Sequence, residues 1–133
     1  MRPSKRQYLM RVALLTAERS TCSRLQVGAV LADTSLETFV IGYNGSYKGG
    51  PNECRGDVKT PGGCGCVHAE VNAVAKAGRG RKILFVTHAP CLICATLLVN
   101  ADVREVYYNQ LYRSEDGISL LKEAGIGVFE CPV

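Results

Sequence analysis

The sequence predicts an α/β fold in three layers, α-β-α, in which helices cover both faces of one five-stranded mixed sheet. The first two β-rich segments of the chain are joined by a short turn, which predicts an antiparallel hairpin. From residue 68 onward, helical and extended segments alternate, which predicts parallel strands joined by right-handed crossovers. Apolar residues make up 47% of the 133 residues and charged residues 21%, as in ordinary globular domains. We therefore expect residues 1–133 to form a single domain.

The first half of the chain should hold one helix, the hairpin and a long loop. The helix is expected over residues 4–19, with Ser4 as N-cap, because its hydroxyl can accept a hydrogen bond from a free amide of the first turn. One face of this helix would carry Tyr8, Leu9, Val12, Leu15 and Thr16. The hairpin follows over residues 26–33 and 38–44. Residues 44–66 are rich in glycine and should form a loop that is functional or held in place by other groups.

Three helices and three strands are expected in the second half of the chain. The helices cover residues 68–78, 91–101 and 115–125, and the strands cover residues 82–88, 105–109 and 127–133. In open sheets of this kind, ligands bind beyond the C-terminal ends of the strands and at the N-termini of the helices. Residues near positions 68 and 91 should therefore meet at one site.

The sequence lacks the features of a membrane or secreted protein. No apolar run approaches the roughly 20 residues needed to cross a bilayer. The basic start of the chain has neither the apolar core nor the cleavage site of a signal peptide. We therefore expect a cytoplasmic location, where thiols stay reduced and the seven cysteines indicate metal binding rather than disulfides. The net charge of +4 is typical of a solvated surface, and no dense basic stripe indicates a nucleic-acid groove.

Two motifs carry the residues of a catalytic zinc site. Cys91 and Cys94 are three residues apart at the opening of a helix, where both sulfurs can face one point and the thiolate form is favoured. His68 opens the preceding helix and can supply a third ligand. Three protein ligands and an open fourth position are typical of catalytic zinc, which lowers the pKa of its bound water to about 7. Glu70 can move the proton of that water without binding the metal.

Each motif alone has a simpler interpretation. A Cys-x-x-Cys pair can be a redox pair or half of a structural zinc site, and a histidine near a glutamate can simply begin a helix. Found together, with Pro90 directly before Cys91, the motifs favour hydrolytic zinc chemistry.

These residues form the pattern H-x-E…P-C-x-x-C, which is the signature of zinc nucleobase deaminases. Over nearly its whole length the sequence also resembles the deoxycytidylate (dCMP) deaminases of bacteria and phages. The similar segments, in the family's order, are ERSTCSRLQVGAV, GYNGSYKGG, HAEVNAV, VTHAPCLIC and VYYNQLYRSEDGISLLKEAGIGVF. The resemblance implies a cytidine-deaminase-like fold and zinc-dependent hydrolysis of dCMP to dUMP and ammonia, in pyrimidine nucleotide metabolism. It also implies that activated water attacks C4 of cytosine while Glu70 protonates N3 and then the departing amine.

The resemblance further implies a set of substrate-binding residues. Asn44 would hold the sugar 3′-hydroxyl, and Ala69 would also contact the substrate. Arg24, Tyr112 and Arg113 would meet the 5′-phosphate or the base. An arginine fork suits a phosphate, and a tyrosine can pack on a pyrimidine face. The alternatives are that both arginines are surface charges and that the tyrosine belongs to the core.

Five cysteines remain outside the catalytic pair. Cys131 lies in the last strand and is expected to be a buried apolar residue. By resemblance, a second, structural zinc would be bound by Cys22, Cys54, His88 and either Cys64 or Cys66. Ordering a long glycine-rich loop is costly in entropy, and a four-ligand zinc could hold both of its ends. The alternative is that these are free buried thiols and that the histidine is satisfied by a hydrogen bond.

The resemblance also implies a homo-oligomer, with a hexamer as the expected form, and dCTP and dTTP as effectors. Two other functions remain open. A deaminase of polynucleotides, acting on tRNA adenosine or single-stranded cytosine, would share the zinc core but needs a more basic surface. A non-catalytic zinc-binding module that senses nucleotides would not need the carboxylate of Glu70.

Overall fold

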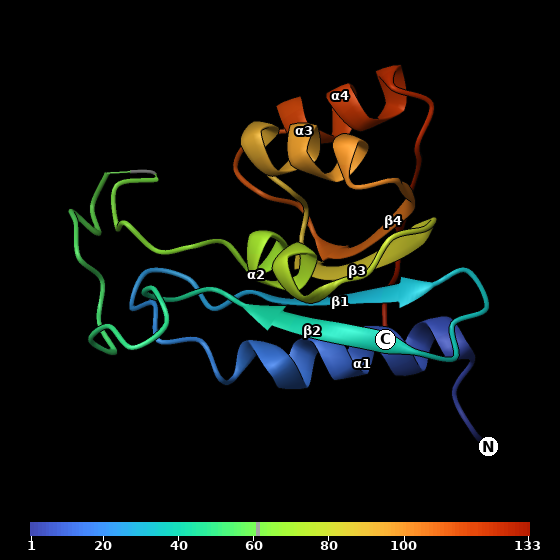
Figure 1. The fold of residues 1–133 in the computed structure, drawn as a ribbon, viewed down its shortest axis with the longest axis horizontal. Helices are drawn as coiled ribbons and strands as arrows, with labels where there is room; N and C mark the ends of the chain where they lie inside the picture. The colour runs from blue at the N-terminus through green and yellow to red at the C-terminus, as the bar shows by residue number, and fades with distance from the viewer. Residues whose placement is uncertain (61) are drawn as a thin grey trace.

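The computed structural model describes residues 1–60 and 62–133, and its strands form one five-stranded sheet (Figure 1). The strands are β1 (Gly28–Asp33), β2 (Phe39–Tyr43), β3 (Lys82–His88), β4 (Val103–Gln110) and β5 (Gly127–Glu130). The helices are α1 (Lys5–Ala17), α2 (Ala69–Lys76), α3 (Leu92–Asn100) and α4 (Asp116–Glu123).

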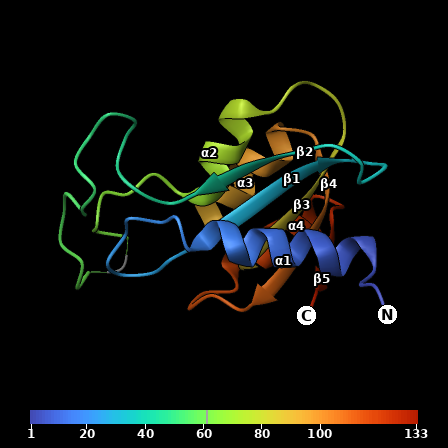
Figure 2. The same cartoon turned by 90° about the horizontal axis from the view of Figure 1, so that it is seen from below.

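The sheet has the strand order β2-β1-β3-β4-β5. β1 pairs antiparallel with both β2 and β3, while β3, β4 and β5 are parallel to one another. This arrangement confirms the predicted hairpin followed by strand–helix–strand units. α1 covers one face of the sheet and α2, α3 and α4 cover the other, so the three predicted layers are also confirmed (Figures 1 and 2).

The core lies on both faces of the central strand β3. Leu84 and Val86 point into the cluster under α2, α3 and α4, and Ile83 and Phe85 point into the cluster under α1. Alternating apolar side chains that are buried on both faces are expected of a strand covered by helices on each side. Among the described residues, no helix combines the length and apolar character that crossing a bilayer requires.

α1 begins at the predicted N-cap. The Ser4 hydroxyl accepts a hydrogen bond from the Gln7 amide at 3.1 Å, and the Gln7 side chain accepts one from the Ser4 amide, also at 3.1 Å. These two bonds form a capping box, which satisfies two amides that the helix itself leaves free.

The face of α1 that carries Tyr8, Leu9, Val12, Leu15 and Thr16 is not the face that meets the sheet, since Tyr8 and Leu15 are 51% and 66% exposed. The reason is the close contact between the helix and the sheet at Gly28, where an added Cβ would lie 2.0 Å from the Ala13 carbonyl oxygen. The helix therefore turns its small residues towards the sheet. Its buried residues are Leu9, Met10, Ala13, Thr16 and Ala17.

A second close contact sets the position of α2. A Cβ at Gly42 in β2 would lie 2.3 Å from the carbonyl oxygen of Ala69, so only glycine lets the first turn of α2 approach the strand. The long loop that precedes α2 is closed at its base by an antiparallel bridge between Gly45 and Val67. Together these contacts fix the start of α2, where the predicted catalytic residues lie.

Candidate active site and metal centres

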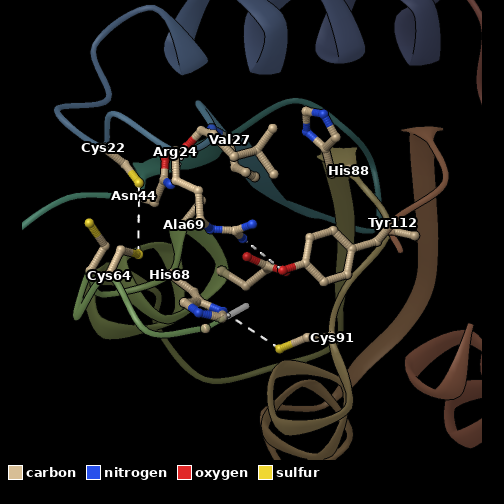
Figure 3. A pocket seen from close by; sticks show the side chains of 15 residues that line it. Cys22, Arg24, Val27, Asn44, Cys64, His68, Ala69, His88, Cys91 and Tyr112 are labelled. Carbon is tan, nitrogen blue, oxygen red and sulfur yellow. Dashed lines mark hydrogen bonds between the residues drawn. The ribbon is translucent and has the colours of Figure 1, made fainter. Parts of the chain in front are cut away.

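The predicted catalytic ligands meet at the N-termini of two helices, beyond the C-terminal end of β3. His68 is the N-cap residue of α2, and Cys91 is the N-cap residue of α3. His68 Nδ1 lies 3.2 Å from Cys94 Sγ and 3.6 Å from Cys91 Sγ (Figure 3). About a tetrahedral zinc, bonds of roughly 2.0 Å to nitrogen and 2.3 Å to sulfur would place these atoms about 3.5 Å apart. The three side chains therefore fit a zinc ion.

The environment favours a thiolate at Cys91. Hydrogen bonds from the Cys94 side chain, and then from His68, lower the pKa of the Cys91 thiol to about 3. The same hydrogen bond to Cys91 raises the pKa of His68. A metal binds thiolate and neutral imidazole. A cation bound here would therefore replace the protons of the Cys91 and Cys94 thiols and the proton on His68 Nδ1.

Glu70 lies in the first turn of α2 and is 4% exposed. Burial raises the pKa of its carboxyl group to about 7. A carboxyl group with this pKa can both accept and donate a proton near neutral pH, as a general acid–base requires. Its oxygens are not in the group of mutually close ligand atoms formed by His68, Cys91 and Cys94 among the described residues.

A second cluster is formed by four cysteines, Cys22, Cys54, Cys64 and Cys66, whose sulfurs all lie within 4.8 Å of one another. The Sγ atoms are separated by 3.6 Å (Cys22–Cys54), 3.7 Å (Cys54–Cys66) and 3.8 Å (Cys22–Cys64). Zinc–sulfur bonds of about 2.3 Å in a tetrahedral site place two sulfurs roughly 3.8 Å apart. This cluster, which we call the tetrathiolate cluster, therefore also fits a zinc ion.

The composition of this cluster corrects one prediction. Cys64 and Cys66 both belong to it, whereas His88 does not. The amides of Arg55 and Gly56 both donate to the Cys64 carbonyl, at 3.0 and 2.9 Å, and this turn brings the loop back on itself. Because the loop folds in this way, it supplies three thiols of its own, and the fourth position is filled without the histidine.

Ser23 contacts the Cys54 thiol and favours its thiolate form, which is the form that binds a metal. The spacing of the cysteines does not indicate this contact. The Ser23 hydroxyl and then the Ser23 amide hydrogen-bond to Cys54 Sγ, at 3.5 and 3.4 Å, and lower the pKa of the Cys54 thiol to about 6. Burial raises the pKa of Cys66 instead. Burial also acts to raise the pKa of Cys64, but hydrogen bonds from the Cys66 backbone and side chain outweigh it and lower that pKa. The isolated cluster thus favours thiolate at two of its sulfurs, Cys54 and Cys64.

The two clusters share the wall of one pocket, whose volume is about 500 Å³ when the open space at its mouth is counted. Cys22, Cys64 and Cys66 line one side, and His68 and Cys91 line another. Among the described lining residues, Glu70 is the only carboxylate.

Two arginines, Arg24 and Arg113, contact Tyr112, which lines this pocket. Arg24 Nη2 donates to the hydroxyl of Tyr112 at 3.0 Å (Figure 3). The guanidinium carbon of Arg113 lies 4.4 Å from the centre of the Tyr112 ring, and Arg113 Nη1 also donates to the Tyr112 hydroxyl. Arg24 Nε is buried and has no hydrogen-bond partner among the described residues. A bound anion would satisfy this donor, since buried N–H groups are almost always paired.

Asn44 and Ala69 also line the pocket, but the amide of Asn44 is largely used within the protein. Asn44 Oδ1 accepts from the Val27 amide at 2.8 Å, and Nδ2 donates to the Leu25 carbonyl at 2.7 Å. One N–H of the side chain remains for a ligand. Asn44 therefore holds in place the segment that carries Arg24, a role that its position in the sequence does not reveal.

Comparisons with known proteins agree with this geometry. The family model described as "cytidine and deoxycytidylate deaminase zinc-binding region" matches residues 3–110. The deoxycytidylate deaminases of Saccharomyces cerevisiae and Schizosaccharomyces pombe are 38% and 35% identical over 96% and 94% of this chain. The chain spans only 45% and 43% of those two relatives.

A solved structure covers the whole fold. The dCMP deaminase of the cyanophage S-TIM5, in complex with dCMP and dUMP, superimposes with a TM-score of 0.85 at 32% identity and covers 98% of this chain and 99% of that chain. Family model, relatives and structure all include the segments that hold His68, Glu70, Cys91 and Cys94. The chain therefore belongs to the family of zinc-binding cytidine and deoxycytidylate deaminases.

Proposed function

We propose that this protein is a zinc-dependent deaminase that hydrolyses dCMP to dUMP and ammonia. The observation that carries the proposal is a single pocket with a three-ligand metal site and a buried carboxyl group at one end and an unpartnered arginine donor at the other. The similarity to deoxycytidylate deaminases from yeasts and a cyanophage supports the same substrate.

The chemistry divides among four residues. His68, Cys91 and Cys94 would hold the zinc and leave its fourth position to water. When bound, the zinc supplies the Lewis acidity that makes this water nucleophilic near neutral pH. Glu70 takes one proton from the water and donates it to N3 of cytosine as the water oxygen forms a bond to C4. It then takes the second proton of that oxygen and delivers it to the amino group, which leaves as ammonia when the C4–N bond breaks. Its burial keeps the carboxyl group in the pKa range that both transfers need.

The other end of the pocket would bind the nucleotide. Arg24 and Arg113 are the donors for the 5′-phosphate, and the Tyr112 hydroxyl keeps the two guanidinium groups together. The remaining N–H of Asn44 is available to the sugar 3′-hydroxyl, and Ala69 places the first free amide of α2 at the base.

A second zinc is proposed in the tetrathiolate cluster. Four protein ligands close a zinc site, and closed sites are structural. Such a zinc would tie Cys22, which precedes β1, to three cysteines of the loop. The cofactors of one chain would then be one catalytic and one structural zinc ion.

Further properties are proposed from the resemblance. Residues 1–133 would act as one deaminase domain in a cytoplasmic homo-oligomer that responds to dCTP and dTTP. All seven cysteines are free, which supports a reducing compartment. The exposed Leu92 and Ile93 on α3, at 48% and 80%, support contact with another subunit.

The test is to incubate the zinc-loaded protein with dCMP, deoxycytidine, dCTP and a cytosine-containing oligonucleotide, and to follow the loss of cytosine absorbance. We expect turnover of dCMP and much slower turnover of the other three. Turnover of the oligonucleotide with none of dCMP would indicate a polynucleotide deaminase. No turnover of any substrate by protein that contains zinc would favour a non-catalytic module.

A further inference from the structure

His88 is left without the metal-binding role that the resemblance implied. The tetrathiolate cluster already has four sulfurs, the number that closes a structural zinc site. His88 is instead half-buried at the end of β3 and lines the pocket. Its ring therefore faces the space that a ligand would occupy.

The hydrogen bonds of Thr87 determine which nitrogen of this ring carries the proton. Thr87 is 2% exposed, and its Oγ1 accepts a hydrogen bond from the Gly28 amide at 3.1 Å. Its buried hydroxyl proton also needs an acceptor, and within the described part of the chain the remaining partner is His88 Nδ1, at 3.0 Å. Nδ1 therefore accepts, and the proton of the neutral ring is on Nε2.

Burial keeps this ring neutral. It lowers the pKa of His88 below the ordinary value for histidine. A protonated ring would carry N–H on both nitrogens and would leave the Thr87 hydroxyl without its acceptor. The protein thus presents His88 Nε2–H as a fixed, neutral donor.

The neighbours of His88 place this donor at the arginine end of the pocket. β3 pairs His88 with Gln110, just before the turn that carries Tyr112. On the other side, Thr87 is hydrogen-bonded to Gly28, which follows Val27 and the segment that carries Arg24. In Figure 3, His88 and Cys91 lie on opposite sides of the Tyr112 ring.

We propose that His88 is a specificity-determining residue that donates its Nε2–H to the 5′-phosphate of the bound nucleotide, beside Arg24. Among the described lining residues, the only carboxylate is Glu70, and it lies two residues from His68 rather than beside His88. A neutral N–H and an arginine together would distinguish a nucleotide from a nucleoside. The assignment rests on the proposed function, since it takes a deoxynucleoside monophosphate as ligand.

Two variants of His88 test the assignment by calorimetry on zinc-loaded protein. His88→Gln keeps an N–H donor at a similar reach, and His88→Met removes it at similar volume. We expect His88→Met to weaken dUMP binding by about 10- to 100-fold, the effect of losing a hydrogen bond to a charged group. His88→Gln should stay within about threefold of the unsubstituted protein. Deoxyuridine binding and zinc content should not change in either variant.

Three outcomes would overturn the assignment: loss of one zinc per chain, equal weakening of dUMP and deoxyuridine, or no change for dUMP in His88→Met. Nitrogen-15 NMR gives a second reading on the unsubstituted protein, which has only two histidines. We expect the His88 ring to carry its proton on Nε2 and to shift on addition of dUMP but not of deoxyuridine. A proton on Nδ1, or no shift with dUMP, would contradict the proposal.

The NMR reading measures binding rather than turnover. A protein that binds dUMP through His88 but does not consume dCMP would therefore refute the proposed activity and leave the His88 contact standing.

Discussion

Glu70 is a carboxyl group with 4% of its surface exposed, two residues from a metal ligand. Substituting Glu70→Gln preserves the shape of the side chain but removes its ability to exchange protons. We expect kcat for dCMP to fall by about 10²- to 10⁴-fold, the usual contribution of general acid–base catalysis. Zinc content, measured by elemental analysis, should stay the same because Glu70 lies outside the ligand group. Loss of zinc together with activity would show that Glu70 has a structural role.

Arg24 has a buried donor, Nε, that has no hydrogen-bond partner among the described residues. We expect Arg24→Gln to raise KM for dCMP by roughly 10-fold or more, because a charge-assisted hydrogen bond is lost. The rate with deoxycytidine should not change. Arg104→Gln is the matched control, since Arg104 is exposed and paired with Asp102 on the surface. Equal losses with dCMP and deoxycytidine would refute a phosphate contact.

At this scale the sequence predicted that the candidate catalytic residues lie together, because their geometry is local. A helix N-terminus brings together Cys91 and Cys94 whatever the rest of the fold does, and His68 and Glu70 also lie at the start of one helix. The sequence did not predict in the same way that Cys66, rather than His88, completes the tetrathiolate cluster. This depends on how a long loop turns back on the Cys64 carbonyl, which no spacing in the sequence encodes.

Among the elements, α1 is fixed against the sheet by the absence of a side chain at Gly28. We expect Gly28→Ala to lower the free energy of unfolding by about 1–3 kcal/mol, because the added methyl group would overlap backbone atoms of α1. Gly78→Ala is the control, since an added Cβ there meets nothing within 4 Å. Denaturant unfolding of the two variants gives the comparison. Equal stability of both would show that α1 can shift without cost.

The existence and order of the elements could be predicted because apolar periodicity and turn residues are local signals. The orientation of α1 could not, since Tyr8 and Leu15 share a predicted face with Leu9 but are exposed in the structure. Their periodicity is compatible with a buried face, but the contact of Ala13 with Gly28 decides which side of the helix meets the sheet. That contact joins two elements and is invisible in either segment alone.

The loop before α2 supplies three of the four cysteines of the tetrathiolate cluster. We expect Cys64→Ser to reduce the zinc content by one ion per chain and to expose residues 44–66 to limited proteolysis, since the loop has no strand or helix of its own in its described part. Cys131→Ser is the control, because Cys131 is buried outside both clusters and should leave zinc content unchanged. A variant of Cys64 that keeps two zinc ions would contradict a structural zinc at this cluster.

Over the whole molecule, the two thiol-containing clusters and the arginine end meet in one pocket beyond the C-terminal end of β3. The parallel strand–helix units predicted from the sequence place the site there, since parallel strands direct the N-termini of the following helices to one edge. The side chains proposed to bind the nucleotide, such as Arg24 and Tyr112, come from segments far apart in the chain. Only the folded structure brings these together.

The central claim is that dCMP is deaminated by hydrolysis, and product analysis in water enriched in oxygen-18 tests it most directly. Zinc-loaded protein would be incubated with dCMP and the product examined by mass spectrometry. We expect dUMP with one oxygen-18 atom in its base, together with an equal amount of ammonia. Unlabelled dUMP, or no dUMP from protein that carries its zinc, would contradict the claim.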